Sequence, residues 1–486
     1  MRCHRAPWHA CLARAGRVSS LAWGLAGCQD GIGNQGEGTT SATATDDAAT
    51  GSTATTSSES SGDSTSTTID GTDTGSTTGV ASECGNGIRE IGEQCDGLEV
   101  AGVPCPETCS FPAMTVLWEV QFDVEAASRD RVEAVAGAPD GRVIAGGNVD
   151  SSEAWLAAIS PTGEVEWIER PEADVVNSIV VLDADAYIVG GTRDTAMWIS
   201  RYDGSGAVVW QDTVEGPAEF GHYYPGTVTL LADGRIALVG SAELGGTEPG
   251  YLALYDVDGV LEELQTFAAP IFDRPSMTGD FTIFGTAIGN DVVISGHALL
   301  PMIGNAPWLQ KRGLDGVVYF ERSLMSPTGG NADRFVQAAA AADGGFSVAG
   351  GYGSVATDPR DIWIGSYSPE GDLRWEDVYV GEYGRQDLAA GVAVDSLGRT
   401  FMLGTVSDDD HAEQSERNYD MVLLSHAADG ERRWEEVYSG DGMGGGAYSF
   451  DYAGAIAVDG VGFVLAAGYT MTPDTDYDVL VRLIAP

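Results

Sequence analysis

Lysine is almost absent from this sequence, and so is any long apolar run. The chain has 25 basic residues, of which Lys311 is the one lysine, against 73 acidic residues, giving a formal net charge of −48. Such a surface repels phosphate backbones and anionic lipid, which argues against nucleic-acid binding. No apolar run approaches the length that crosses a bilayer, so no transmembrane helix is expected.

Catalytic signatures are also missing. The motifs G-x-S-x-G and H-E-x-x-H do not occur. The stretch from Gly440 to Gly445 fits G-x-G-x-x-G, but it joins two expected strands with no helix after it, so it offers no phosphate site. Beyond residue 28 the histidines are far apart in the sequence: His222, His297, His411 and His426. The sequence therefore nominates no catalytic residue.

The N-terminus is typical of an export signal. Four arginines precede a short apolar stretch from Val18 to Ala26, which ends in the sequence Leu-Ala-Gly before Cys28. Small residues before a cysteine fit the extended site of a signal peptidase. Residues 1–27 thus resemble a bacterial lipoprotein signal; the alternative is a chance match or a misplaced start. The resemblance implies that Cys28 carries the lipid and is the chain's one attachment to the outer membrane or cell surface.

Residues 28–83 differ sharply in composition from the rest. They are almost wholly Ser, Thr, Gly, Asp and Ala. Such a segment cannot bury enough apolar surface to offset the entropy lost on ordering, so we expect a disordered stalk.

Four cysteines lie in residues 84–112, and none follows them: Cys84, Cys95, Cys105 and Cys109. An even number in an exported chain predicts two disulfides, with three pairings open. A zinc site is the rival interpretation, disfavoured because histidine and a C-x-x-C pair are absent. The run C-G-N-G-x-x-x-x-G-E-x-C-D-G resembles a cysteine-rich repeat found beside Ser/Thr-rich stalks in secreted myxobacterial proteins.

Residues 113–486 repeat one pattern of four short strands seven times. A period of roughly fifty residues with four strands per unit is typical of a β-propeller. The fourth strands centre on a tryptophan in five units, and we expect these rings to pack between blades: Trp118, Trp167, Trp210, Trp375 and Trp434. The repeats resemble exported bacterial β-propeller repeats, best over 362–375, 391–398 and 478–483. That resemblance indicates a fold and no function.

The ends of the repeat array predict how the ring closes. The seventh unit holds three strands, whereas residues 116–120 form an unpaired fourth strand at the start. Pairing that strand with the C-terminal unit completes seven four-stranded blades and removes exposed edges. The sequence therefore predicts an all-β, seven-bladed propeller, expected to be a monomer.

The connections between second and third strands, and between fourth and first strands, are long, as at residues 214–226 and 298–307, and in a propeller both sets emerge on one face. Aromatic and acidic side chains there suit recognition of a protein or carbohydrate, and equally suit solvated loops. The candidate binding-face residues are Phe220, His222, Tyr223, Tyr224, Asp408, Asp409, Asp410, Tyr448, Phe450 and Tyr452.

Calcium is the one cofactor that the sequence suggests. Asp474, Asp476 and Asp478 alternate, and hard cations favour such carboxylates, although the glycine and distal glutamate of an EF-hand loop are missing. The alternative is an acidic entry to a strand.

These features favour a surface lipoprotein that presents a propeller as a binding or scaffolding module. The alternative is a glycan hydrolase or lyase that uses carboxylates of the long-loop face; a subunit of the outer-membrane assembly machinery is a third option. A carboxylate pair about 5–10 Å apart in a deep central pocket would favour the enzyme. A flat or solvent-filled centre would favour binding.

Overall fold

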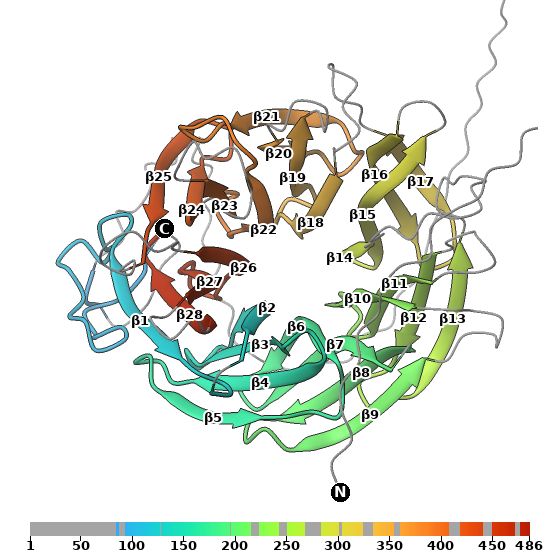
Figure 1. Cartoon of the computed structure of the whole chain (residues 1–486), viewed down its shortest axis with the longest axis horizontal. Helices are drawn as coiled ribbons and strands as arrows, with labels where there is room; N and C mark the ends of the chain where they lie inside the picture. The colour runs from blue at the N-terminus through green and yellow to red at the C-terminus, as the bar shows by residue number, and fades with distance from the viewer. Residues whose placement is uncertain are drawn as a thin grey trace, which may run out of the picture. The chain divides into compact units, whose positions relative to one another are not determined.

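The computed structural model describes residues 84–86, 93–126, 128–194, 196–214, 223–242, 250–267, 283–300, 304–323, 334–353, 360–407, 418–440, 450–471 and 477–486. Within these segments, no helix has the length and apolar character needed to cross a membrane. The strands form seven four-stranded antiparallel sheets around a common centre (Figure 1). The prediction of a seven-bladed propeller is confirmed.

The innermost strands of blades one to seven are β2 (Asp130–Gly137), β6 (Val175–Asp183), β10 (Tyr223–Leu230), β14 (Phe284–Ile288), β18 (Arg334–Ala340), β22 (Leu388–Val394) and β26 (Asp451–Val458). The second strands are β3 (Val143–Val149), β7 (Ala186–Arg193), β11 (Ile236–Ala242), β15 (Asp291–Leu300), β19 (Phe346–Gly353), β23 (Thr400–Ser407) and β27 (Val464–Met471). Figure 1 shows the innermost strands beside the centre of the ring.

The third strands are β4 (Glu153–Ile159), β8 (Ala196–Asp203), β12 (Gly250–Tyr255), β16 (Gly304–Gly313), β20 (Arg360–Tyr367), β24 (Tyr419–His426) and β28 (Tyr477–Ile484). The outer strands are β5 (Val165–Glu169), β9 (Val208–Val214), β13 (Leu261–Phe267), β17 (Val318–Ser323), β21 (Leu373–Tyr379), β25 (Arg432–Tyr438) and β1 (Val116–Phe122). Second and third strands are apolar runs because both of their faces pack against neighbouring blades; β3 and β23 are buried at every position.

The ring is closed by β1, as the sequence predicts. This strand pairs with β28, so that Trp118 lies opposite Leu483 and Phe122 lies opposite Val479. The backbone contact continues beyond the ladder, because Met114 N donates to Ala485 O at 2.9 Å. The first strand after the cysteine-rich module is therefore the outer strand of the seventh blade.

The outer-strand tryptophans pack between blades, as predicted, and the structure explains their Gly-x-x-x-Trp spacing. Four of these rings, and Phe320 in the fourth blade, lie against the glycine of the tight turn before the outer strand of the next blade. A Cβ atom added to Gly430 would lie 2.6 Å from Cγ of Trp375, and one added to Gly259 would lie 2.5 Å from Cδ2 of Trp210. The same glycines have a φ near +90°, which other residues adopt at a cost. Five of the seven blade junctions use this contact: Trp118 with Gly163, Trp167 with Gly206, Trp210 with Gly259, Phe320 with Gly371, and Trp375 with Gly430.

Two connections differ from expectation. Residues 298–307 were predicted to form a long loop, but β15 and β16 continue as ten-residue strands, with Leu300 opposite Gly304. Likewise β10 begins at Tyr223, within a predicted loop, and Tyr223 pairs with Ala242. Leucine and tyrosine favour strands, and a continued ladder satisfies backbone groups that a loop leaves to water.

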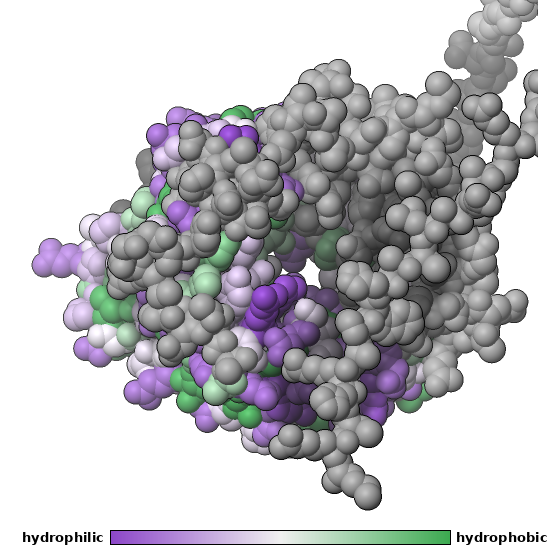
Figure 2. All heavy atoms as spheres, in the orientation of Figure 1, coloured by the Kyte–Doolittle hydropathy of each residue, from purple (hydrophilic) through white to green (hydrophobic). Residues whose placement is uncertain are grey.

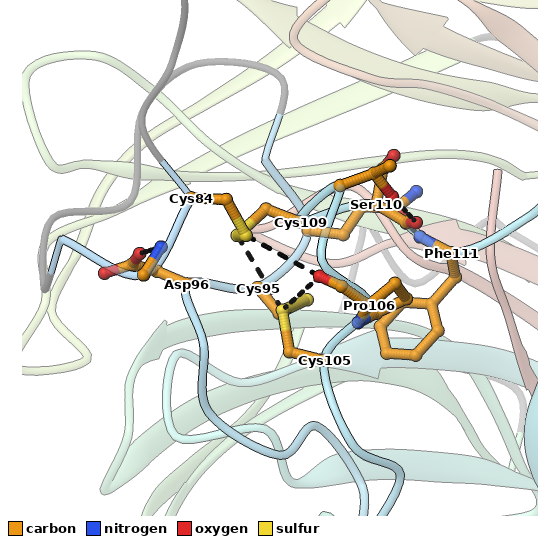
Figure 3. The surroundings of a disulfide bond; sticks show 11 residues. Cys84, Cys95, Asp96, Cys105, Pro106, Cys109, Ser110 and Phe111 are labelled. Carbon is orange, nitrogen blue, oxygen red and sulfur yellow. Dashed lines mark hydrogen bonds between the residues drawn. A yellow bond between two sulfur atoms is a disulfide. The ribbon is translucent and has the colours of Figure 1, made fainter.

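The cysteine-rich module contains two disulfides, and the structure selects one of the three pairings. Cys84 joins Cys109 with a Cα–Cα distance of 5.4 Å, and Cys95 joins Cys105 at 5.8 Å (Figure 3). Asp96 accepts a hydrogen bond from Gly85 N at 2.6 Å. Since all four thiols are consumed, a zinc site built on them is excluded. Disulfides of this kind are typical of exported proteins.

The module packs against the tight-turn face of the propeller. The rings of Phe111 and Phe463 have centroids 6.0 Å apart, and Phe463 ends the tight turn between β26 and β27. Phe111 and Cys95 are buried in the same apolar cluster as Leu465 and Leu483. In an antiparallel blade the tight turns and the long connections lie at opposite ends. The module therefore attaches at the end opposite the long connections.

Candidate functional site

The structure describes few of the predicted site residues. Of the candidate binding face it places Tyr223 and Tyr224 in β10, Tyr452 at the start of β26, and Phe450 just before β26. The other binding-face candidates lie outside the described residues: Phe220, His222, Asp408, Asp409, Asp410 and Tyr448. Cys28, Asp474 and Asp476 also lie outside them. Asp478 lies in β28, where it accepts a hydrogen bond from Gln121 Nε2 at 3.0 Å.

A channel with a volume of about 570 Å³ runs along the centre of the ring. The innermost strands of all seven blades line it, and Figure 2 shows it as an opening with strongly hydrophilic residues beside it near β2. Tyr452 and Tyr469 line it from the seventh blade, and Thr405 does so from the sixth.

The innermost strands carry a recurrent β-bulge. In β2 the register shifts between Val132 and Ala134, so that Glu133 is the unpaired extra residue. In β6 the shift falls between Val176 and Ser178 and leaves Asn177 extra. A bulge re-aims the side chain of the extra residue, and both of these residues line the channel. Strands β10, β18, β22 and β26 have the same irregularity, at Pro225 with Gly226, Val336, Ala390 and Gly454 respectively.

Polar side chains at the bulges therefore occur on two adjacent blades. Burial raises the pKa of the Glu133 carboxyl, and the nearby Arg131 guanidinium opposes that shift. Asn177 Oδ1 is buried and has no hydrogen-bond donor. Among the described residues that line the channel, Glu133 is the one carboxylate.

Aromatic rings gather at the long-connection end of blades six and seven. The Tyr419 and Tyr452 ring centroids are 5.3 Å apart, those of Tyr452 and Tyr469 are 5.2 Å apart, and Tyr469 meets Tyr477 edge-on at 5.6 Å. The Arg129 guanidinium lies 5.9 Å from the centre of the Tyr477 ring. These rings pack on one another, and Tyr452 and Tyr469 also line the channel.

His426 is structural, as expected of an isolated histidine. It is fully buried between blades, its ring stacks on that of Trp375, and its Nε2 lies 2.8 Å from Asp377 Oδ2. Arg432 Nη2 also lies 2.6 Å from that oxygen. Burial lowers the pKa of His426, so the neutral ring is favoured. The cluster lies away from the channel and holds blade five to blade six.

Buried aspartates fasten long connections to the innermost strands. Asp387 accepts hydrogen bonds from Gly381 N at 2.7 Å and from Ser407 N at 3.4 Å. Asp451 accepts one from Gly440 N at 2.7 Å. A Cβ atom added to Gly440 would lie 2.9 Å from Asp451 Oδ1, which explains the first glycine of the G-x-G-x-x-G match. Burial raises the pKa of Asp387 to about 7, although its hydrogen bonds oppose that shift.

The Asp387 carboxyl predicts a pH-dependent stability. The folded state keeps a proton between about pH 4 and pH 7 that the unfolded state releases, so the stability contributed by protonation is lost as pH rises through this window. We expect Asp387→Asn to remove this loss. Between about pH 4 and pH 7 the free energy of unfolding of the wild type should fall by about 2–4 kcal/mol more than that of Asp387→Asn. Urea unfolding across pH measures it, with the exposed Asp258→Asn as control. Parallel pH profiles for wild type and Asp387→Asn would refute the assignment.

No protein-family profile and no curated protein matches the sequence. Among solved structures, the WD40 repeats of RRP9 align with a TM-score of 0.48 and 10% identity, over 77% of this chain and 99% of that one. A protein of unknown function from Dyadobacter fermentans aligns with a TM-score of 0.44 and 10% identity, over 77% of this chain and 100% of that one. Another, from Bacteroides caccae, aligns with a TM-score of 0.38 and 13% identity, over 63% of this chain and 94% of that one. These similarities carry no argument about function.

Proposed function

We propose that this protein is an exported, non-catalytic binding protein whose ligand enters the long-connection mouth of the central channel. The observation that carries the proposal is the single carboxylate, Glu133, among the described residues that line the channel. A glycan hydrolase needs two carboxyl groups about 5–10 Å apart, one to donate a proton and one to attack or activate water. One carboxylate with a neighbouring amide and tyrosine hydroxyls suits recognition.

The attachment of the cysteine-rich module leaves the long-connection mouth of the channel uncovered by that module. Phe111 and Cys95 pack at the tight-turn end, so the described chain enters the propeller there. We propose that residues 28–83 are a stalk and that Cys28 bears the lipid. Such an anchor would join the propeller at the end opposite the long connections. Mass spectrometry of the native N-terminus tests the anchor, and an unmodified Cys28 would refute it.

Blocking the channel tests the binding site. Ala390 is the bulge residue of β22 and lines the channel, so Ala390→Trp is expected to fill the passage. We expect this variant to lose at least about tenfold in affinity for any glycan or peptide that the wild type binds on arrays, a change of about 1.4 kcal/mol. Val209→Trp, at a site 54% exposed on an outer strand, is the matched control. Undiminished binding by Ala390→Trp, or turnover of a bound glycan, would contradict the proposal.

A further inference from the structure

The channel lining offers no positive charge. Among the described residues that line it there is no lysine, arginine or histidine, and Glu133 holds the one carboxyl group. Burial raises the pKa of this carboxyl, which favours its neutral form. An anionic ligand would find no counter-ion in this lining, and burying an unpaired charge is costly. The lining therefore favours a neutral ligand.

Two side chains that line the channel also join neighbouring blades. Ser178 directly follows the bulge residue of β6, and its Oγ accepts a hydrogen bond from Val228 N of the next blade at 2.7 Å. Gln337 holds the same position in β18, and its Oε1 accepts one from Val392 N at 3.1 Å. In both side chains an oxygen atom is thus fixed by the backbone of the adjacent blade.

A hydrogen-bond donor remains at each of these positions. The Ser178 hydroxyl keeps its proton and Gln337 keeps its Nε2 amino group, and neither donates to an acceptor in the described part of the chain. Thr405 repeats the arrangement, because its Oγ1 accepts from Ala453 N at 2.9 Å and its hydroxyl proton stays available. The lining therefore presents donors on side chains that are already held in place.

The donors of Ser178 and Gln337 lie at the same level of the ring as Glu133, which is the bulge residue of β2. At this bulge level, blades six and seven have the small residues Ala390 and Gly454. Polar groups thus line the channel from blades one, two and five, and the small residues leave space between blades five and one. A ligand seated there can reach groups from several blades.

We propose that the bulge level of the channel binds one neutral hexopyranose unit, whose hydroxyl groups accept hydrogen bonds from Ser178 and Gln337 and donate one to Glu133. This inference rests on the proposed function and names the ligand class of that site. A sugar hydroxyl both donates and accepts, so it matches a lining that holds both kinds of group. The channel volume of about 570 Å³ accommodates a pyranose ring.

Calorimetry on the whole protein with matched sugars tests the inference. The neutral probes are the methyl pyranosides of glucose, galactose, mannose and N-acetylglucosamine, each compared with the uronate and the 2-amino sugar of its own series. We expect at least one neutral glycoside to bind with a Kd of about 10 mM or tighter. Its two charged forms should bind at least about tenfold more weakly, because each would bury an unpaired charge.

Variants test the individual contacts. Gln337→Glu keeps the oxygen that accepts from Val392 N but loses the amide donor, so we expect it to weaken binding of the neutral glycoside about tenfold. Gln211→Glu is the matched control, because Gln211 lies on the outer strand β9, where its Oε1 accepts from Trp198 Nε1 at 3.5 Å. Glu133→Gln should preserve binding, since its amide oxygen still accepts, whereas Glu133→Ala should weaken it about tenfold.

Three results would overturn the inference. They are binding of a charged form as tight as that of the neutral glycoside, no binding of any neutral glycoside at about 100 mM, and unchanged binding by Gln337→Glu. If the glycosides fail but array peptides bind, and Ala390→Trp abolishes that binding, the proposed function survives this failure.

Discussion

A chain that begins at residue 124 is expected to fail to form a stable propeller, whereas one that begins at residue 113 folds. The first lacks β1 and so leaves the seventh blade with three strands. Leu117 and Trp118 are 8% and 7% exposed, and burial of such side chains contributes about 1.5–3 kcal/mol each. The loss is at least about 4 kcal/mol once the ladder to β28 is included. Denaturant unfolding followed by circular dichroism measures it.

Both chains lack residues 84–112. A difference between their stabilities therefore reports the contribution of β1 and not that of the cysteine-rich module. The shorter chain should also self-associate, since β28 becomes an exposed apolar edge. Sedimentation velocity reports that association. Equal unfolding midpoints for the two chains would show that β1 contributes nothing to the ring.

Gly430→Ala is expected to destabilise the protein by about 2–4 kcal/mol. The residue has a φ of +93°, which costs a non-glycine residue about 1–2 kcal/mol. The new Cβ would also lie 2.6 Å from Cγ of Trp375, so the ring must shift out of its contact between blades. Overpacking of this kind typically costs about 1–3 kcal/mol.

Gly234→Ala isolates the backbone part of that cost. Gly234 has a φ of +88° but no atom within 4 Å of its added Cβ. We therefore expect Gly430→Ala to exceed Gly234→Ala by at least about 1 kcal/mol in urea unfolding. Combining Gly430→Ala with Trp375→Ala should remove the excess. If the two glycine variants are equally stable, the ring contact does not explain the Gly-x-x-x-Trp spacing.

Most of the fold was predictable because it depends on repeated local signals. Most tight turns contain glycine, although the turn between β6 and β7 does not, and each blade needs apolar second and third strands. The unpaired strand at residues 116–120 also marked the closure. The paired extension of β15 and β16 was not predictable, because Leu300 and Gly304 meet through a ladder that no local pattern announces.

The channel residues were missed for a physical reason. Glu133 and Asn177 lie within apolar strands, and period-two alternation does not show which residue is extra in a bulge. A signal did exist: at the equivalent positions β22 and β26 have Ala390 and Gly454. Superposing the seven repeats would have exposed two polar residues on adjacent blades. The sequence analysis took its candidate binding residues from the long connections instead, and few of those residues lie in the described part of the chain.

In this account β1 completes the seventh blade and closes the ring around the channel. Hydrogen–deuterium exchange of the intact protein tests this directly, because ladder hydrogen bonds to β28 slow the exchange of backbone amides. We predict that the amides of residues 116–122 that donate to β28 exchange far more slowly than those of an unstructured peptide. Exchange of residues 116–122 at the rate of an unstructured peptide, with β28 still protected, would contradict the account.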